Sequence, residues 1–183
     1  MNETLKTIAE RYSCRDFSSA PLSDSQIKAL VEAALAAPSA RNLQPWHVTV
    51  VTDKKLIEEL DAEGMNLLAT AEDKSSYDFI MERGGKMLFN APCMIVVASD
   101  GSKWAPTDCG ILSQNVALAA HSLGLGNVLC GMARVLFSGP RGDELKKKLK
   151  FPDGYSFGLS ILVGKANSGK EPHEFDMSKV SYI

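Results

Sequence analysis

The chain has 183 residues, of which 45% are hydrophobic and 23% are charged. This composition is typical of a globular protein, and we expect a single domain over residues 1–183. The net charge of −2 excludes a global positive field, so we expect neither nucleic acid nor a membrane surface as a partner. The basic run 146–148 stands beside Asp143 and Glu144 and is expected to be a solvated helix face.

Cysteine and histidine usage favours a reducing, cytoplasmic location. The cysteines at positions 14, 93, 109 and 130 contain no C-x-x-C pair, which is unlike a disulfide framework or a zinc ribbon. The three histidines lie far apart, so we expect no metal site. The charged first twelve residues are unlike a secretory signal, and the apolar run 93–98 is too short to span a bilayer.

The predicted elements alternate between helices and short strands. Ser23 and Gln26 match a capping box ahead of an apolar stripe, and Asp53 is expected to cap a further helix. The polar segment 62–90 is predicted to be only partly helical. In chain order, the sequence predicts helices over 5–12, 27–35, 53–60, 106–123 and 143–150, and strands over 47–52, 93–98, 128–131 and 157–163.

This order predicts α/β or α+β layering, with helices covering a sheet. The continuous apolar run 93–98 is typical of a strand that is covered on both faces. The helix over 106–123 is apolar on most sides and is expected to be central. Two phosphate motifs are incomplete. G-x-x-x-x-G-K over 164–170 is followed by Glu rather than Ser or Thr, and the Gly124–Gly126 pair lacks the third glycine of a dinucleotide fingerprint.

The segment R-Y-S-C-R over 11–15 follows the first predicted helix. In an extended chain Arg11, Ser13 and Arg15 lie on one side and offer two guanidinium groups and a hydroxyl, a set that suits a phosphate. Two arginines at this spacing are also compatible with ordinary surface charges, and this alternative stays open.

Two later segments offer polar groups of a different kind. Pro38 and Pro45 bracket a loop whose Ser39, Asn42 and Gln44 could read the polar edge of a flat heterocycle. The alternative is a turn-rich connector with Trp46 as its core anchor. In the segment 124–132, glycines would let backbone amides approach a ligand closely.

Together these segments resemble the FMN-dependent nitroreductase family. The family signature R-x-S-x-[RK]-x-F is matched over 11–17, and A-P-S-x-x-N-x-Q-P-W over 37–46. The helix motif D-x-G-x-x-x-Q-N-x-x-L-A-A-x-x-L-G-L-G is matched over 108–126. The resemblance implies an α+β fold with a central mixed, mostly antiparallel sheet flanked by helices, and an intertwined homodimer with two FMN sites at its interface.

The resemblance also implies roles for particular residues. Arg11, Ser13 and Arg15 match contacts to the FMN phosphate and ribityl chain. The loop residues match contacts that reach the flavin from the partner subunit; these are Pro38, Ser39, Asn42 and Gln44.

The resemblance implies flavin contacts in three further parts of the chain. The segment Cys130, Gly131 and Met132 matches the one whose backbone amide binds flavin N5. Lys86 falls where the family places a lysine near the flavin N1/O2 edge. Three C-terminal side chains are alternative candidates for the last phosphate contact: Lys165, Lys170 and His173.

The implied activity is a hydride transfer from NADH or NADPH through FMN to an electron-poor acceptor, such as a nitro compound or a quinone, in a ping-pong mechanism. The flavin carries the redox chemistry, so no protein acid, base or nucleophile is required. Two alternatives stay open: an FMN-binding protein that senses or stores flavin, and a specialised branch that performs dehalogenation or ring fragmentation. For Cys14 and Cys130 we expect apolar packing rather than a redox role.

Overall fold

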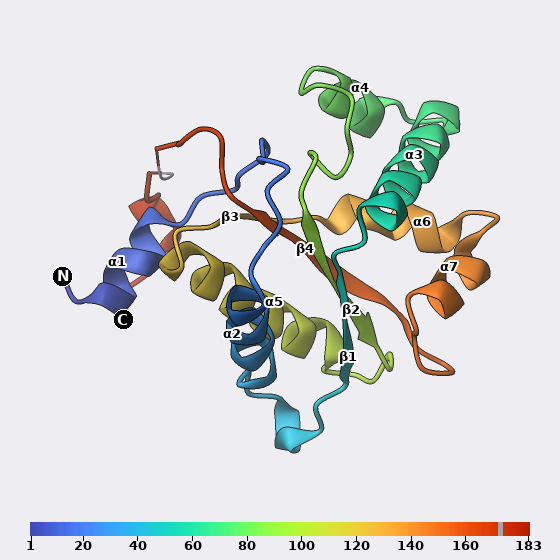
Figure 1. The fold of residues 1–183 in the computed structure, drawn as a ribbon. Coiled ribbons are helices and arrows are strands. Elements are labelled where there is room, and N and C mark those ends of the chain that lie inside the picture. The colour runs from blue at the N-terminus through green and yellow to red at the C-terminus, as the bar shows by residue number, and fades with distance from the viewer. Residues whose placement is uncertain (172–173) are drawn as a thin grey trace.

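The computed structural model describes residues 1–171 and 174–183 (Figure 1). Within these residues the strands form one four-stranded sheet in the order β1-β2-β4-β3, and each neighbouring pair is antiparallel. The central strands are in register through Ile95 and Ile161, and Ile161 also pairs with Leu129. The strands are β1 (Trp46–Val51), β2 (Cys93–Ser99), β3 (Gly126–Leu129) and β4 (Ser156–Gly164).

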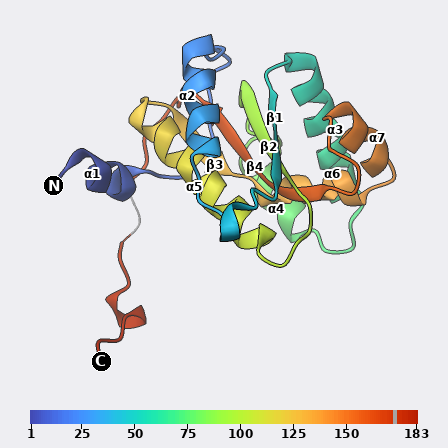
Figure 2. The same ribbon diagram turned by 90° about the horizontal axis from the view of Figure 1, so that it is seen from below.

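Helices cover both faces of the sheet, which makes the protein an α+β fold (Figures 1 and 2). One face carries α2 (Asp24–Leu35) and α5 (Ala105–Ser122), and the other carries α3 (Lys54–Thr70), α6 (Arg134–Ser138) and α7 (Gly142–Lys148). The remaining helices are α1 (Glu3–Glu10), α4 (Ser75–Met81) and the short 3₁₀ turns η1 (Ala40–Asn42), η2 (Gly131–Ala133) and η3 (Met177–Lys179).

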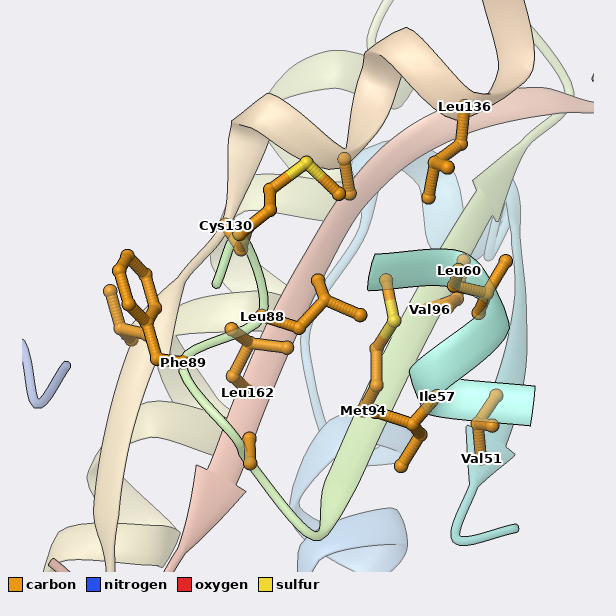
Figure 3. Close-up of a cluster of buried hydrophobic side chains, with 14 of the residues drawn as sticks. Val51, Ile57, Leu60, Leu88, Phe89, Met94, Val96, Cys130, Leu136 and Leu162 are labelled. Atoms are coloured by element: carbon orange, nitrogen blue, oxygen red, sulfur yellow. The ribbon is translucent and has the colours of Figure 1, made fainter. Parts of the chain in front are cut away.

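The core has two halves, one on each side of the sheet, because successive side chains of a strand point to opposite faces. On the α3 side, Met94, Val96 and Leu162 pack against Leu60 and Leu136 (Figure 3). On the other side, buried strand residues contact α2 and α5; this half includes Leu30, Ile95, Val97, Leu112, Val116 and Ile161. Every residue of β2 is buried, as the continuous apolar run predicted.

Local signals in the sequence are confirmed at the helix starts. The Ser23 side chain accepts from the Gln26 amide, and the Gln26 side chain accepts from the Ser23 amide, which completes the capping box. Asp53 Oδ1 accepts from the Leu56 amide at 2.9 Å and caps α3.

Several boundaries differ from the prediction. The third strand ends at Leu129 rather than Gly131, because the chain turns into η2 at that point. Helix α3 continues to Thr70, and α6 was not predicted. Leu35, expected in the buried stripe of α2, is exposed in the single chain.

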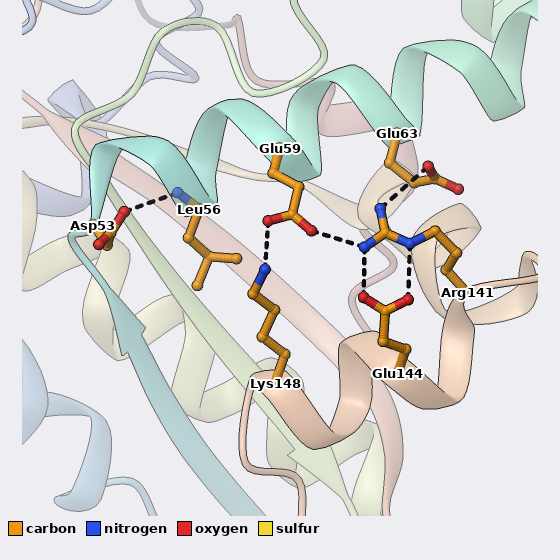
Figure 4. Close-up of polar contacts among 7 residues, drawn as sticks. All are labelled: Asp53, Leu56, Glu59, Glu63, Arg141, Glu144 and Lys148. Carbon is orange, nitrogen blue, oxygen red and sulfur yellow. Dashed lines mark hydrogen bonds and ion pairs between the residues drawn. The ribbon is translucent and has the colours of Figure 1, made fainter.

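Helices α3 and α7 are joined by a network of charged side chains (Figure 4). Arg141 lies between three carboxylates, with its Nη2 2.8 Å from Glu59 and its Nη1 3.6 Å from Glu63, and it also pairs with Glu144. Lys148 adds a second cation to Glu59. Among the described residues, no helix is both long enough and apolar enough to cross a membrane.

Candidate functional site

The segment that follows α1 is extended, and it begins two residues earlier than the predicted helix over 5–12 allows. Helix α1 ends at Glu10, and Ser13 forms a parallel bridge with Asn127 of β3. The amide of Cys14 donates to the Asn127 carbonyl at 2.8 Å, and the Cys14 side chain is buried. This bridge adds a parallel contact beside the antiparallel sheet.

The flanking side chains of this segment remain available to a ligand. Arg11, Ser13 and Arg15 are all half-buried. Within the described part of the chain, neither arginine forms an ion pair with a carboxylate, and the Ser13 hydroxyl has no hydrogen-bond partner. Two unpaired guanidinium groups and a free hydroxyl are the donors that a phosphate monoester requires.

The chain after β4 lies alongside the same segment. Phe17 forms an antiparallel bridge with Ala166, and the Ser18 amide donates to the Lys165 carbonyl at 2.8 Å. Lys165 is exposed. Lys170 is also exposed but lies beyond this pairing, and His173 lies outside the described residues. This pairing places Lys165 beside Ser18, whereas the residues after it run back along the segment 11–16: the Asn167 amide donates to the Asp16 carbonyl, and the Tyr12 hydroxyl donates to the Ser168 carbonyl.

Cys130 and Ser160 hold the start of η2 in place. The Cys130 amide donates to the Ser160 carbonyl, and the Ser160 hydroxyl donates to the Cys130 carbonyl, each at 2.8 Å. The next residue, Gly131, is exposed, and its amide donates to no acceptor among the described residues. The first amides of a helix have no partner within the helix, so the Gly131 N–H is a fixed donor for a ligand atom.

The side chains on either side of Gly131 both pack in the core on the α3 side. Met132 is half-buried and packs against the core on the α3 side. Burial raises the pKa of the Cys130 thiol, while hydrogen bonds to the backbone and to Ser160 and the charge of Arg15 oppose this rise. Burial likewise raises the pKa of the Cys14 thiol. Buried, protonated thiols are consistent with a packing role for both cysteines.

Lys86 does not lie on a helix. The chain leaves α4 at Met81 and passes through Gly84 and Gly85, whose φ angles of 93° and 68° are in the left-handed region. Lys86 is half-exposed, and its Nζ lies 3.5 Å from Oδ2 of Asp61 on α3.

The turn that carries Lys86 is anchored to the core. The other carboxylate oxygen of Asp61 accepts from the Leu88 amide at 2.7 Å. Leu88 and Phe89 pack in the same half of the core as Cys130 (Figure 3). Lys86 therefore stands at the edge of the core half that contains Cys14 and Cys130.

The loop 38–44 is exposed and lies away from the segment 11–15 in the same chain (Figures 1 and 2). Its shape is set by internal hydrogen bonds: the Gln44 amide donates to Ser39 Oγ at 2.9 Å, and Gln44 Nε2 donates to Asn42 Oδ1 at 3.1 Å. Trp46, which follows the loop, is buried and anchors it to the core. One chain thus assembles the segments 11–15, 130–132 and 165–168, but not this loop.

Three residues near these segments were missed by the sequence analysis. Asn127 is only 1% exposed, and both polar atoms of its side chain lack a hydrogen-bond partner among the described residues. Phe79 of α4 lies under two guanidinium groups, 5.8 Å from Arg15 and 3.7 Å from Arg83. Asp108 binds the loop 38–44 through the Ala40 amide. Asn127 and Asp108 lie inside recognised motifs, whereas no pattern distinguished Phe79.

Two surface clefts differ in their relation to the predicted site residues. A cleft of about 720 Å³ is lined by Phe17, Thr52, Ile57, Asn90 and Pro92, among others, and by none of the predicted site residues. A second cleft of about 360 Å³ lies beside Gln44 and Trp46. Within the described residues, no group of three or more potential metal ligands is found.

The chain is similar to known proteins over most of its length. The nitroreductase family model matches residues 8–165. A nitroreductase with bound FMN from Desulfitobacterium hafniense is 53% identical, with a TM-score of 0.96 and coverage of 100% of this chain and 99% of that one.

Two more distant relatives are flavin reductases. An FMN reductase (NAD(P)H) of Bacillus subtilis is 32% identical over 89% of this chain and 65% of its own length. An NADPH-flavin oxidoreductase of Vibrio harveyi is 29% identical over 93% of this chain and 69% of its own length. The match covers the segment 11–15, the loop 38–44 and the helix α5, and the chain belongs to the nitroreductase family.

Proposed function

We propose that the protein is an FMN-dependent oxidoreductase that uses NADH or NADPH to reduce an electron-poor acceptor, a nitro compound or a quinone, in a ping-pong mechanism. The family match and the flavin reductases among the relatives support this proposal. The observation that carries it is the parallel bridge from Ser13 to Asn127, which sets the segment 11–15 beside β3, the strand that leads to the unpaired Gly131 amide.

The donor set of the chain fits FMN. Arg11, Ser13 and Arg15, joined by Lys165 or Lys170, would hold the phosphate and the ribityl chain, because they offer positive charge and hydrogen bonds without a competing carboxylate. When bound, FMN supplies the redox chemistry, taking a hydride equivalent from the nicotinamide and passing it to the acceptor.

Two other groups of the chain would act on the ring system. The Gly131 amide would donate a hydrogen bond at N5 and so fix the ring at its reacting edge. The Lys86 ammonium would stabilise negative charge at the N1/O2 edge. Neither role requires the protein to supply or accept a proton, so we propose no catalytic acid or base.

A second copy of the chain would complete the site. The loop carrying Pro38, Ser39, Asn42 and Gln44 cannot reach the segment 11–15 of its own chain in this arrangement (Figures 1 and 2). Large apolar side chains at both ends of the chain are exposed, including Leu5 (54%) and Ile8 (49%) of α1. Such exposure is typical of surfaces that a partner covers. We therefore propose a homodimer in which each subunit lends this loop to the other.

The test of the activity is spectroscopic. We expect the purified protein to carry the absorbance of non-covalent FMN, which NADH or NADPH bleaches under anaerobic conditions and a quinone or nitro compound restores. Release of FAD instead of FMN would contradict the cofactor assignment. Tight FMN binding without any reduction by either nicotinamide would instead favour a flavin carrier or sensor.

The oligomer is tested separately. Light scattering is expected to give about twice the chain mass of 19.8 kDa. A monomer of the chain mass that retains FMN would contradict the shared site.

A further inference from the structure

A buried carboxylate is joined to the loop that the partner is proposed to receive. Asp108, in the first turn of α5, is only 4% exposed. Its two carboxylate oxygens lie 3.3 and 3.2 Å from the amide nitrogen of Ala40, the first residue of η1. Among the described residues, the Ala40 amide is the one hydrogen-bond donor to the Asp108 carboxylate. The two residues are 68 positions apart in the sequence, so this hydrogen bond ties α5 to a distant loop.

The loop needs such support, because its backbone is strained. Arg41, Asn42 and Gln44 have φ angles of 54°, 55° and 48°, a region that side chains other than glycine rarely adopt. Asparagine tolerates this conformation, whereas arginine and glutamine do so less readily. Contacts at both ends must therefore maintain the shape that presents the polar side chains.

The two ends are held differently. At the far end, Trp46 is buried and its amide donates to the Gln44 carbonyl at 2.8 Å. At the near end, Pro38 is exposed, and the bond from the Ala40 amide to Asp108 is the contact that joins the turn to a helix. A hydrogen bond to a buried charge is stronger than one to a neutral acceptor.

We propose that Asp108 is a positioning residue for the flavin site of the partner subunit. It holds the Ala40 amide, which fixes η1, and η1 presents Ser39, Asn42 and Gln44 across the dimer interface. The inference rests on the proposed shared site. Its consequence is specific: loss of Asp108 from one chain impairs the FMN site of the other chain.

A mixed dimer separates this role from a purely structural one. An Arg15→Ala chain damages the phosphate contacts of its own site, whereas an Asp108→Ala chain damages the loop that it lends. In a heterodimer of these two chains, one site carries both defects and the other carries neither. If Asp108 acted within its own chain, each site of the heterodimer would carry one defect.

The experiment co-expresses the two chains with different tags and measures FMN binding to the purified heterodimer by flavin fluorescence. Each variant homodimer is expected to bind FMN at least about tenfold more weakly than the wild type, the effect of one charge-assisted hydrogen bond. The heterodimer is expected to bind one FMN per dimer with wild-type affinity. Two weakened sites in the heterodimer, or wild-type affinity in the Asp108→Ala homodimer, would overturn the proposal.

A second variant protects the test against misfolding of α5. Ala40→Pro removes the donor and leaves Asp108 in place. The position suits proline, because Ser39 is extended, with φ −139° and ψ 156°, and Ala40 is the first residue of η1. We expect Ala40→Pro to replace Asp108→Ala in the heterodimer with the same result, and Asp108→Asn, which keeps an acceptor, to bind FMN more tightly than Asp108→Ala.

The same measurement distinguishes a failure of the proposed function from a failure of the role proposed for Asp108. A wild-type protein that does not bind FMN would refute the proposed function itself, and a wild-type monomer that binds FMN would refute the shared site. A wild-type dimer with two tight FMN sites, combined with a heterodimer lacking a tight site, would refute only the role of Asp108. A heterodimer in which Ala40→Pro fails to reproduce Asp108→Ala would also refute that role.

Discussion

Cys130 and Ser160 are joined by a reciprocal pair of backbone and hydroxyl hydrogen bonds, each 2.8 Å long, at the point where β3 ends beside β4. Both residues are buried. The pair stops the strand ladder one residue before Gly131 and leaves the Gly131 amide exposed in a fixed position. The end of the strand thereby offers the backbone donor that we propose for the flavin.

Gly131 allows this donor to be tested with a matched control. Gly131→Pro removes the N–H, whereas Gly131→Ala keeps it, and the added Cβ would meet only Leu159 Cδ1 at 3.9 Å. We expect Gly131→Pro to weaken FMN binding by about 0.5–1.5 kcal/mol, the net value of one hydrogen bond, and Gly131→Ala to bind nearly normally. Fluorescence titration measures both. Equal affinities for the two variants would show that the amide does not contact the flavin.

Arg15 is expected to act on the phosphate. Arg15→Ala should weaken FMN binding by roughly 1.5–3 kcal/mol, the scale of a hydrogen bond to a charged group, and should weaken riboflavin binding much less. Titration with both flavins measures the difference. Lys28→Met, which removes one positive charge from the exposed face of α2, serves as the control for net charge. Similar losses for FMN and riboflavin would instead place Arg15 on the ring system.

Much of the fold could be predicted, because its signals are local. The capping box at Ser23 and the cap at Asp53 depend on side chains within three positions of each other, and both form as predicted. The end of β3 could not be predicted, because it depends on Ser160, thirty positions away from Cys130. Likewise, the left-handed turns at Gly84 and Gly85 remove Lys86 from any helix.

The sequence proposes a set of candidate site residues but does not predict their arrangement. Arg11, Ser13 and Arg15 alternate with buried Cys14, and this alternation is visible in the sequence. No spacing indicates that the loop 38–44 lies apart from them, since that separation depends on how α2 and β1 pack (Figure 1). The exposure of Leu5 and Ile8 on α1 could not be predicted either, because a helical apolar pattern does not show whether the same chain or a partner covers it.

The charged network around Arg141 is expected to contribute to stability (Figure 4). Arg141→Met should lower the melting temperature by a few degrees, because it leaves Glu59 and Glu63 close together without this cation. Lys54→Met is the control, since it breaks one exposed pair with Glu58 on the same helix. Thermal unfolding at low and at 1 M salt measures both variants, and the difference should shrink at high salt.

The same network predicts a pH dependence. Hydrogen bonds from Lys148 and Arg141 lower the pKa of Glu59, and the bond from Arg141 lowers the pKa of Glu144. Because these pKa values are depressed in the folded state, the stabilisation is fully present above the unfolded value of about 4.3 and is lost as the pH falls below it. The difference in melting temperature between wild type and Arg141→Met should therefore be constant near neutral pH and shrink below about pH 4. A difference that persists at low pH would attribute the effect to packing of the arginine stem.

Lys86 is expected to set the reduction potential of the bound flavin. Its ammonium is half-exposed and lies 3.5 Å from the buried Asp61 carboxylate, so part of its charge is already offset. Lys86→Met removes the cation and leaves that carboxylate uncompensated, and both effects disfavour negative charge on the reduced flavin. We expect the midpoint potential to fall by on the order of 30 mV, or about 1.4 kcal/mol for a two-electron couple, while the affinity for oxidised FMN changes less.

An anaerobic potentiometric titration measures the shift, with Lys86→Arg expected to restore the potential and the exposed Lys55→Met as the charge control. If Lys86→Met and Lys55→Met have the same potential, Lys86 serves only to hold the turn through Asp61.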